Sequence, residues 1–155
     1  MSAASVAATN LWVPAAPFRS YVLHLMESSR VPWRVIAQRA GVSAPVVRTL
    51  LFGRDGRPRR RLDRHSAAGL LAVTPAELDA LRHLSLPAGP LRVRLQRLRA
   101  HGLSRVGVAH LLGSDAESVR RWEDGSLTTC SGLVDARARA AVAALDEAAG
   151  GRSAW

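Results

Sequence analysis

The chain carries an internal repeat. Shifted by 72 residues, residues 18–73 align with residues 90–145 without a gap, with identities that include Leu23/Leu95, Arg48/Arg120 and Asp63/Asp135. A repeat of this length predicts two small units of one kind rather than a single large domain. Both copies share one spacing of Ala, Gly, Val and a large apolar residue, seen at Ala37, Gly41, Val47, Leu50 and at Ala109, Gly113, Val119, Trp122.

That spacing predicts a helix-turn-helix in each copy. Ala37 suits a close crossing of two helices, Gly41 permits a turn with positive φ, and Val47 and Leu50 share the buried face of the second helix. We expect each copy to hold a first helix, the two helices of the motif and a closing helix. Their predicted ranges are 18–28, 33–40, 44–52 and 63–72 in the first copy, and 91–101, 105–112, 115–124 and 135–148 in the second.

Capping residues support these ranges. Ser43 is a predicted N-cap, Ser114 with Glu117 forms a predicted capping box, and Asp begins each closing helix. Thr74-Pro75-Ala76-Glu77 predicts a connecting helix over 75–84, and Leu86–Pro90 a linker. The predicted fold is therefore all-α. Its expected parts are a flexible arm at 1–17, a first helix-turn-helix domain at 18–73, a connecting helix and linker at 74–89, and a second helix-turn-helix domain at 90–149.

The charge balance is strongly basic: 22 cations, all Arg, face 12 acids and give a net charge of +10. Such an excess points first to nucleic acid and second to an anionic membrane surface. GC-rich coding accounts for the absence of Lys. No apolar run reaches the roughly 18 residues of a membrane-spanning helix, and no signal peptide is seen, so we expect a cytoplasmic, nucleoid-associated protein without membrane attachment.

Nothing in the sequence favours catalysis. Cys130 is the only cysteine, which rules out an intramolecular disulfide and a zinc site built on several cysteines. The histidines lack the spacing of metal ligands, and Cys130 has no neighbouring base. We therefore expect no enzyme activity, no catalytic residue, no metal and no cofactor.

The residues of both copies resemble the lambda-repressor-like (Cro/CI, XRE-type) helix-turn-helix family. The resemblance rests on Ile36-Ala37, Gly41-Val42-Ser43 and Leu50–Gly53, and on Val119–Gly125 in the second copy. The tandem, Arg- and Ala-rich layout is similar to small regulators of actinobacteria and their phages, including immunity repressors. The resemblance implies a sequence-specific regulator of transcription, a repressor, that binds duplex DNA through the second helix of each motif, the recognition helix.

The resemblance, with the basic segment 53–61, assigns a DNA-contacting set. In the first domain it comprises Trp33, Arg34, Ser43, Ala44, Pro45, Arg48, Thr49, Arg54, Arg57, Arg59, Arg60 and Arg61. Arg48 is the expected base reader, since an Arg–guanine pair is bidentate. In the second domain it comprises Arg105, Glu117, Ser118, Arg120 and Arg121, with a basic stripe formed by Arg92, Arg94, Arg97 and Arg99. Segment 56–59 also partly matches the core of an AT-hook, which would lie extended in the minor groove.

Two alternatives stay open. Unequal recognition helices suit a monomer on an asymmetric site, but the second copy is also compatible with a dimerisation or partner-binding module, so that the protein would act as a homodimer. From another class, the chain suits a protein-interaction adaptor, such as an antitoxin or anti-repressor, whose basic loop binds an acidic partner. Residues 114–124 carry four acids and two Arg, so contact of the second recognition helix with DNA is expected to be the weaker of the two.

Overall fold

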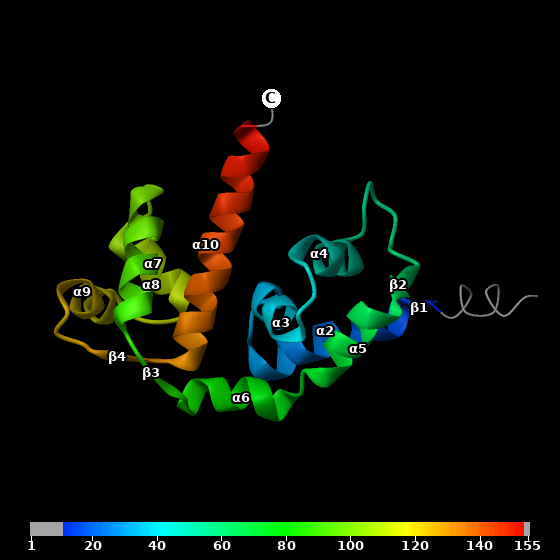
Figure 1. The fold of residues 1–155 in the computed structure, drawn as a ribbon, viewed down its shortest axis with the longest axis horizontal. Coiled ribbons are helices and arrows are strands. Elements are labelled where there is room, and N and C mark those ends of the chain that lie inside the picture. The colour runs from blue at the N-terminus through cyan, green and yellow to red at the C-terminus, as the bar shows by residue number, and fades with distance from the viewer. Residues whose placement is uncertain (1–10, 154–155) are drawn as a thin grey trace, which may run out of the picture. The chain divides into compact units, whose positions relative to one another are not determined.

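The computed structural model describes residues 11–153, which divide between Leu78 and Asp79 into two compact units, unit 1 and unit 2 (Figure 1). Helices dominate both units, and each strand among the described residues is only three residues long, so the predicted all-α class is confirmed. The division between the units falls inside α6 (Pro75–His83), at the place of the predicted connecting helix. Thr74 caps α6, since its Oγ1 accepts from the backbone N–H of Glu77 at 3.1 Å.

Unit 1 places a helix-turn-helix inside a frame of two short strands and two helices. Its elements are β1 (Trp12–Pro14), α2 (Ala16–Ser29), α3 (Trp33–Ala40), α4 (Ala44–Phe52), β2 (Arg61–Asp63) and α5 (Arg64–Ala72). Strand β1 pairs antiparallel with β2, with Val13 opposite Leu62. The expected turn is present: Gly41 has φ +68°, and the N–H of Val42 donates to the carbonyl of Ala37.

Unit 2 repeats this order of elements. They are β3 (Ser85–Pro87), α7 (Gly89–Ala100), α8 (Arg105–Leu112), α9 (Ala116–Asp124), β4 (Thr129–Ser131) and α10 (Gly132–Ser153). Strand β3 pairs antiparallel with β4, with Leu86 opposite Cys130. The core gathers Leu91, Leu95 and Leu98 of α7 around Trp122, whose indole N–H donates to the carbonyl of Thr129 at 2.9 Å.

The ungapped alignment of the two copies is wrong outside the two motif helices. Helices α3 and α8 start 72 residues apart, as do α4 and α9, but α5 and α10 start only 68 apart, because the loop after α9 is shorter than the loop after α4. Asp63 therefore corresponds to Ser131 and not to Asp135. Asp63 Oδ1 accepts from Ser66 N–H at 2.8 Å, and Ser131 Oγ accepts from Val134 N–H at 3.1 Å, so both residues cap the closing helix.

The first helices are also out of register with the predicted alignment. Val22 and Leu25 are fully buried in unit 1, and their counterparts Leu95 and Leu98 are fully buried in unit 2, so the match here is 73 residues. Leu23, which the alignment pairs with Leu95, is 49% exposed. From this buried pair to the start of the first motif helix, unit 2 is therefore one residue shorter than unit 1, and side-chain identity alone did not reveal this difference.

The predicted loose ends are shorter than expected. The flexible arm at 1–17 is wrong for residues 11–17, which form β1 and begin α2; residues 1–10 lie outside the described residues. Helix α10 continues past Ala148 to Ser153, and the predicted linker Leu86–Pro90 instead holds strand β3 and the first turn of α7. None of the strands was predicted, because three-residue strands carry too little alternation to be seen in a sequence.

Candidate nucleic-acid interface

The exposed side of α4 holds the residues predicted to contact DNA. Ser43 occupies the N-cap position in an extended conformation, but its side chain makes no capping bond, and Pro45 lies in the first helical turn. Ala44 is half-buried, while Arg48 is exposed and, among the described residues, has neither an ion pair nor a hydrogen bond. The guanidinium group of Arg48 therefore lies on the surface of a helix with its N–H donors available to a ligand.

Thr49 lies beside Arg48 but is already engaged. Its hydroxyl donates to the carbonyl of Val46 at 3.0 Å and accepts from Nη1 of Arg59 at 2.9 Å. Thr49, a predicted DNA contact, thus becomes a link between α4 and the segment that follows it.

The start of α3 lies against the end of α4. The rings of Trp33 and Phe52 meet edge to face with centroids 6.2 Å apart, and the Arg34 guanidinium lies 4.6 Å from the centroid of the Trp33 ring. Phe52 remains 66% exposed. Trp33 and Phe52 therefore form an apolar ridge, with the guanidinium of Arg34 beside it.

The segment after α4 is an ordered hairpin and not an extended strand. The N–H of Arg54 donates to the carbonyl of Arg57 at 2.9 Å, and the N–H of Arg57 donates back at 3.0 Å. Asp55 and Gly56 between them have φ +52° and +75°, the signs that a type I′ turn requires. Gly56 lies in this turn, so residues 56–59 do not form one extended segment as the core of an AT-hook would; insertion of this segment into the minor groove stays a prediction.

Arg19, which the sequence interpretation missed, anchors this segment. Its Nε donates to the carbonyl of Leu50 and its Nη2 to the carbonyl of Arg59, both at 2.7 Å. Arg59 in turn bonds Thr49 and, through Nε, the carbonyl of Arg61 at 2.9 Å. Arg59 was predicted to contact DNA, but its guanidinium instead ties residues 53–61, called the basic arm below and distinct from the predicted N-terminal arm, to α4.

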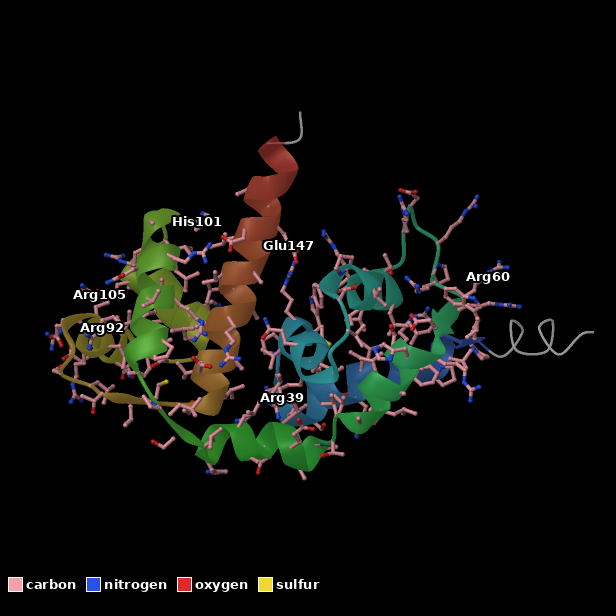
Figure 2. The ribbon with its side chains drawn as sticks, in the orientation of Figure 1. Arg39, Arg60, Arg92, His101, Arg105 and Glu147 are labelled. Carbon is pink, nitrogen blue, oxygen red and sulfur yellow. The ribbon has the colours of Figure 1, made fainter. Side chains whose placement is uncertain are left out.

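Exposed arginines without acidic partners concentrate in unit 1. Arg39, at the end of α3, is an exception, because its Nη2 lies 2.6 Å from Oε1 of Glu77. Arg60 extends from the arm between α4 and β2 (Figure 2). Among the described residues, several exposed side chains on α4 and this arm have neither an ion pair nor a hydrogen bond: Arg48, Arg54, Arg57, Arg60 and Arg61.

Helix α9 has the opposite electrostatic character. Arg120, the counterpart of Arg48, lies between Glu117 and Asp124, with Nη2–Oε1 at 2.5 Å and Nη1–Oδ2 at 2.9 Å. The bonds from Arg120 lower the pKa of the Glu117 carboxyl, and bonds from Ser126 lower that of Asp124. Both acids therefore stay ionised and hold the Arg120 guanidinium along the helix.

The predicted capping box of α9 is wrong. Asp115 is the N-cap residue, and its Oδ1 accepts from the N–H of Ser118 at 2.8 Å, which lowers the pKa of the Asp115 carboxyl. Ser118 is thereby engaged in the cap, through its hydroxyl as well. Glu117 is free to bind Arg120 because it has no capping role. Arg121 alone among the predicted α9 contacts is exposed and, of the described residues, has no side-chain partner.

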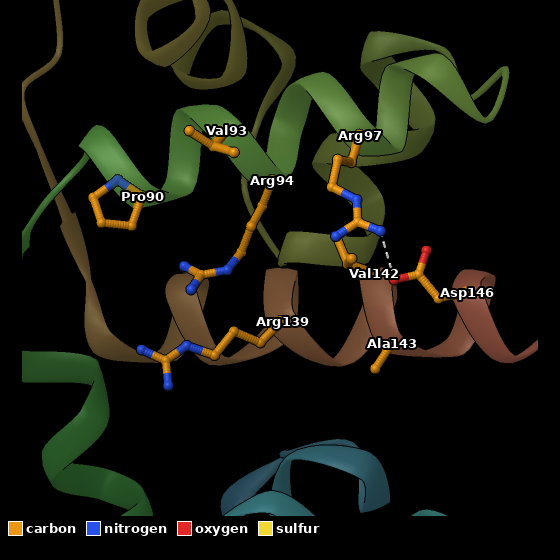
Figure 3. A pocket seen from close by; sticks show the side chains of 8 residues that line it. All are labelled: Pro90, Val93, Arg94, Arg97, Arg139, Val142, Ala143 and Asp146. Carbon is orange, nitrogen blue, oxygen red and sulfur yellow. Dashed lines mark hydrogen bonds and ion pairs between the residues drawn. The ribbon is translucent and has the colours of Figure 1, made fainter.

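The predicted basic stripe on α7 is also engaged internally. Arg92 Nε donates to the carbonyl of Trp122 at 3.0 Å. Figure 3 shows Arg94 and Arg139 from neighbouring helices at one end of a groove and the ion pair of Arg97 with Asp146, 2.8 Å long, at the other. Arg94 and Arg139 both bind the buried carboxylate of Asp135, at 2.5 and 2.9 Å.

Arg105 and Arg99 share a single carboxylate. Nη2 of Arg105, at the start of α8 (Figure 2), lies 3.0 Å from Oε2 of Glu123, and Nε of Arg99 lies 3.6 Å from Oε1. The next residue of α8, Val106, is 70% exposed at the place that Arg34 takes in unit 1. The surface of unit 2 that corresponds to the basic face of unit 1 is therefore apolar and charge-paired.

Comparison with known proteins returns no match to any family model, curated protein or solved structure. Within residues 11–153, no helix has the length and apolar character needed to cross a membrane. The same residues contain no group of three or more His, Cys, Asp or Glu side chains placed to hold a metal ion.

Proposed function

We propose that the protein is a sequence-specific duplex-DNA-binding regulator of transcription, a repressor, and that unit 1 carries the recognition. Helix α4 enters the major groove, which is about 12 Å wide and admits a helix of about 10–12 Å diameter. Arg48 reads a guanine edge, and Ser43, Ala44 and Pro45 lie along the same groove. The bound protein represses transcription by occupying its site on the DNA.

One observation carries this proposal: within the described residues 11–153 the Arg48 side chain has no ion pair or hydrogen bond, whereas its counterpart Arg120 is held by two acids on α9. A guanidinium must present two free donors to a guanine to discriminate it from other bases. Arg48 meets that condition without rearrangement. Arg120 meets it only after leaving Glu117 and Asp124, which makes base recognition by α9 unfavourable.

The surroundings of α4 support binding to the phosphate backbone. Arg34 at the start of α3 and Arg54, Arg57, Arg60 and Arg61 on the arm lie on either side of α4 in the chain and are positively charged at any physiological pH. Contacts of this kind fix the register of a protein on duplex DNA without reading its sequence.

The paired charges of unit 2 favour a second role for that unit, as a module for a protein partner or a second copy of the chain. Its motif surface exposes Val106 and Leu111, while Arg105 is paired with Glu123, and Arg120 with Glu117 and Asp124. Charged residues paired within a surface lower its attraction to a polyanion. Any contact of α9 with DNA is then weak and directed to phosphate through Arg121.

Selection of bound fragments from random duplex DNA, followed by footprinting with the full chain, tests the proposal. We expect one enriched motif containing a guanine whose protection depends on Arg48. An asymmetric footprint occupied by one chain supports a monomer, and a palindrome occupied by two chains supports unit 2 as the dimerisation module. Absence of any enriched motif would remove sequence-specific recognition.

A further inference from the structure

The hairpin after α4 brings two arginines directly opposite each other. Arg54 and Arg57 exchange both backbone hydrogen bonds, which defines a hydrogen-bonded antiparallel pair with Cα atoms about 5.5 Å apart. Side chains of such a pair project from the same face of the hairpin. The side chains of two arginines therefore start from the same face of a two-residue turn, so that both guanidinium groups can reach one ligand.

A pair of like charges in these positions is expected to be unfavourable in the free protein. Like charges directly opposite in a strand pair repel each other and destabilise it. Asp55 is the one acid in the turn, and among the described residues it makes no ion pair with either Arg54 or Arg57. The hairpin thus holds positive charge that it does not neutralise, which is the property expected of a site for an anion.

The backbone is built to hold this shape. Gly53 has φ +72° and ψ −172°, a conformation open almost only to glycine, and a Cβ at this position would lie 2.4 Å from the carbonyl oxygen of Arg57. Asp55 and Gly56 then supply the two positive φ angles of the type I′ turn. The turn residues and Gly53 therefore specify one backbone geometry at the positions of the two arginines before any ligand binds.

The hairpin is also tied to α4. Arg19 bonds the carbonyls of Leu50 and Arg59, and Arg59 bonds Thr49, one residue from Arg48. A ligand held by the hairpin therefore has a fixed position relative to the exposed face of α4.

We propose that Arg54 and Arg57 form a preformed clamp for a single phosphate group of the DNA backbone, gripping it together. The inference rests on the proposed function in that it takes the phosphate from duplex DNA. One phosphate between two guanidiniums offsets their repulsion and accepts charge-assisted hydrogen bonds from both. The clamp sets the register of α4 along the groove.

The experiment compares the full-length wild type with Arg54→Gln, Arg57→Gln and the double variant. Duplex affinity is measured by fluorescence anisotropy across a series of salt concentrations. Because both arginines hold the same phosphate, the double variant lowers the slope of log K against log salt by about 0.9, and each single variant lowers it by less. Arg39→Gln is the control, since it removes the same charge from a residue paired with Glu77, and it leaves the slope unchanged.

A second readout needs no DNA. Each single variant removes the repulsion within the hairpin, so the thermal midpoint of the free protein rises by roughly 1–4 °C at low salt, and the gain shrinks as salt screens the charges. The same substitutions thus stabilise the free protein and weaken its DNA complex. Gly53→Ala keeps both arginines but not their geometry, and it too lowers the salt slope if it remains folded.

Four results separate the possibilities. A slope lowered by about 1.8 in the double variant indicates two phosphates and overturns the shared clamp. An unchanged slope in a protein that still binds its site overturns the contact while the proposed function stands. A fall in the thermal midpoint of both single variants overturns the stored repulsion. Failure of the wild type to bind any duplex overturns the proposed function and with it the ligand of the clamp.

Discussion

The Nε of Arg19 donates a hydrogen bond to the carbonyl oxygen of Leu50, at 2.7 Å, in the last turn of α4. The last carbonyls of a helix lack partners within it, and a cation there also meets the negative end of the helix dipole. Arg92 makes the same bond to Trp122 in unit 2, at 3.0 Å. In both units, therefore, an arginine of the first helix binds a carbonyl in the last turn of the second motif helix, although the exposed residues of the two units differ.

Arg19→Ala is expected to destabilise unit 1 and loosen its arm. The substitution removes bonds from a charged donor to the carbonyls of Leu50 and Arg59, and such bonds contribute about 1.5–3 kcal/mol each when partly buried. Denaturant unfolding measures the loss, and hydrogen exchange follows residues 53–61. Arg64→Ala, at an exposed arginine of α5, is the control. Unchanged exchange across the arm would show that Arg19 does not anchor it.

Gly69→Ala is expected to destabilise the packing of α5 on α3. A Cβ at residue 69 would lie 2.4 Å from the carbonyl oxygen of Ala40, which is backbone and cannot turn aside. Overpacking of this kind costs about 1–3 kcal/mol. Gly150→Ala in α10 is the matched control, because no atom lies within 4 Å of its Cβ; it should stabilise the protein by about 0.5–1 kcal/mol. Equal effects of the two substitutions, seen in thermal unfolding, would contradict the close approach.

Glu117→Gln combined with Asp124→Asn is expected to strengthen binding to duplex DNA of any sequence. The change releases Arg120 from its ion pairs and removes two negative charges from α9. Affinity should rise equally on selected and random duplexes, with a steeper salt dependence. Glu27→Gln with Asp79→Asn gives the same net charge elsewhere in the chain. If both double variants gain equally, the effect comes from net charge and not from Arg120.

Asp63 is expected to make stability depend on pH in the acid range. The bond from the Ser66 N–H holds the pKa of the Asp63 carboxyl below its ordinary value of 3.8, so the unfolded chain takes up its proton first as pH falls. The stabilisation is complete above pH 3.8 and is lost as pH falls through the lower, folded pKa. Asp63→Asn keeps a capping oxygen without the titration, and its stability should vary less with pH there. If the stability of the wild type and of Asp63→Asn falls identically with pH in the acid range, Asp63 does not make this contribution.

The helix-turn-helix was predictable because its constraints are local. A small residue at Ala37, a glycine at Gly41 and the buried pair Val47 and Leu50 are dictated by one close helix crossing and one turn. These constraints act within about 15 residues, and α3, α4, α8 and α9 appear close to their predicted bounds. The exposed position of Arg48 was implied by the family resemblance, and Arg48 is exposed in the structure.

The contacts that distinguish the two units were not predictable, because they join residues far apart in the chain. Arg19 meets Leu50 through the crossing of α2 and α4, and Arg105 meets Glu123 through that of α8 and α9. The excess of acids in α9 predicted a weak attraction to DNA, but it did not predict that Glu117 and Asp124 form ion pairs with Arg120. The shorter loop in unit 2 hid the match of Asp63 with Ser131, since the two residue types cap a helix equally well.

The arm was predicted as a basic loop, and its shape was missed although its signal was present. Asp-Gly is the dipeptide most typical of a type I′ hairpin, but the flanking residues Arg54 and Arg57 lack the alternating hydrophobic pattern that marks strands. Attention to Asp55-Gly56 would have identified the turn. The hydrogen bond from Arg59 to Thr49 could be found only in the three-dimensional structure.

The central claim, that unit 1 reads DNA through Arg48, is tested most directly by the affinity of full-length Arg48→Ala and Arg120→Ala for a selected site and for random duplex. Arg48→Ala should weaken binding to the selected site by about 1–3 kcal/mol and leave binding to random duplex nearly unchanged, because it removes a base contact. Arg120→Ala, which removes a guanidinium already paired with Glu117 and Asp124, should leave the ratio of the two affinities as in the wild type. An equal loss on both duplexes for Arg48→Ala, or a collapse of the ratio for Arg120→Ala, would contradict the assignment of recognition to unit 1.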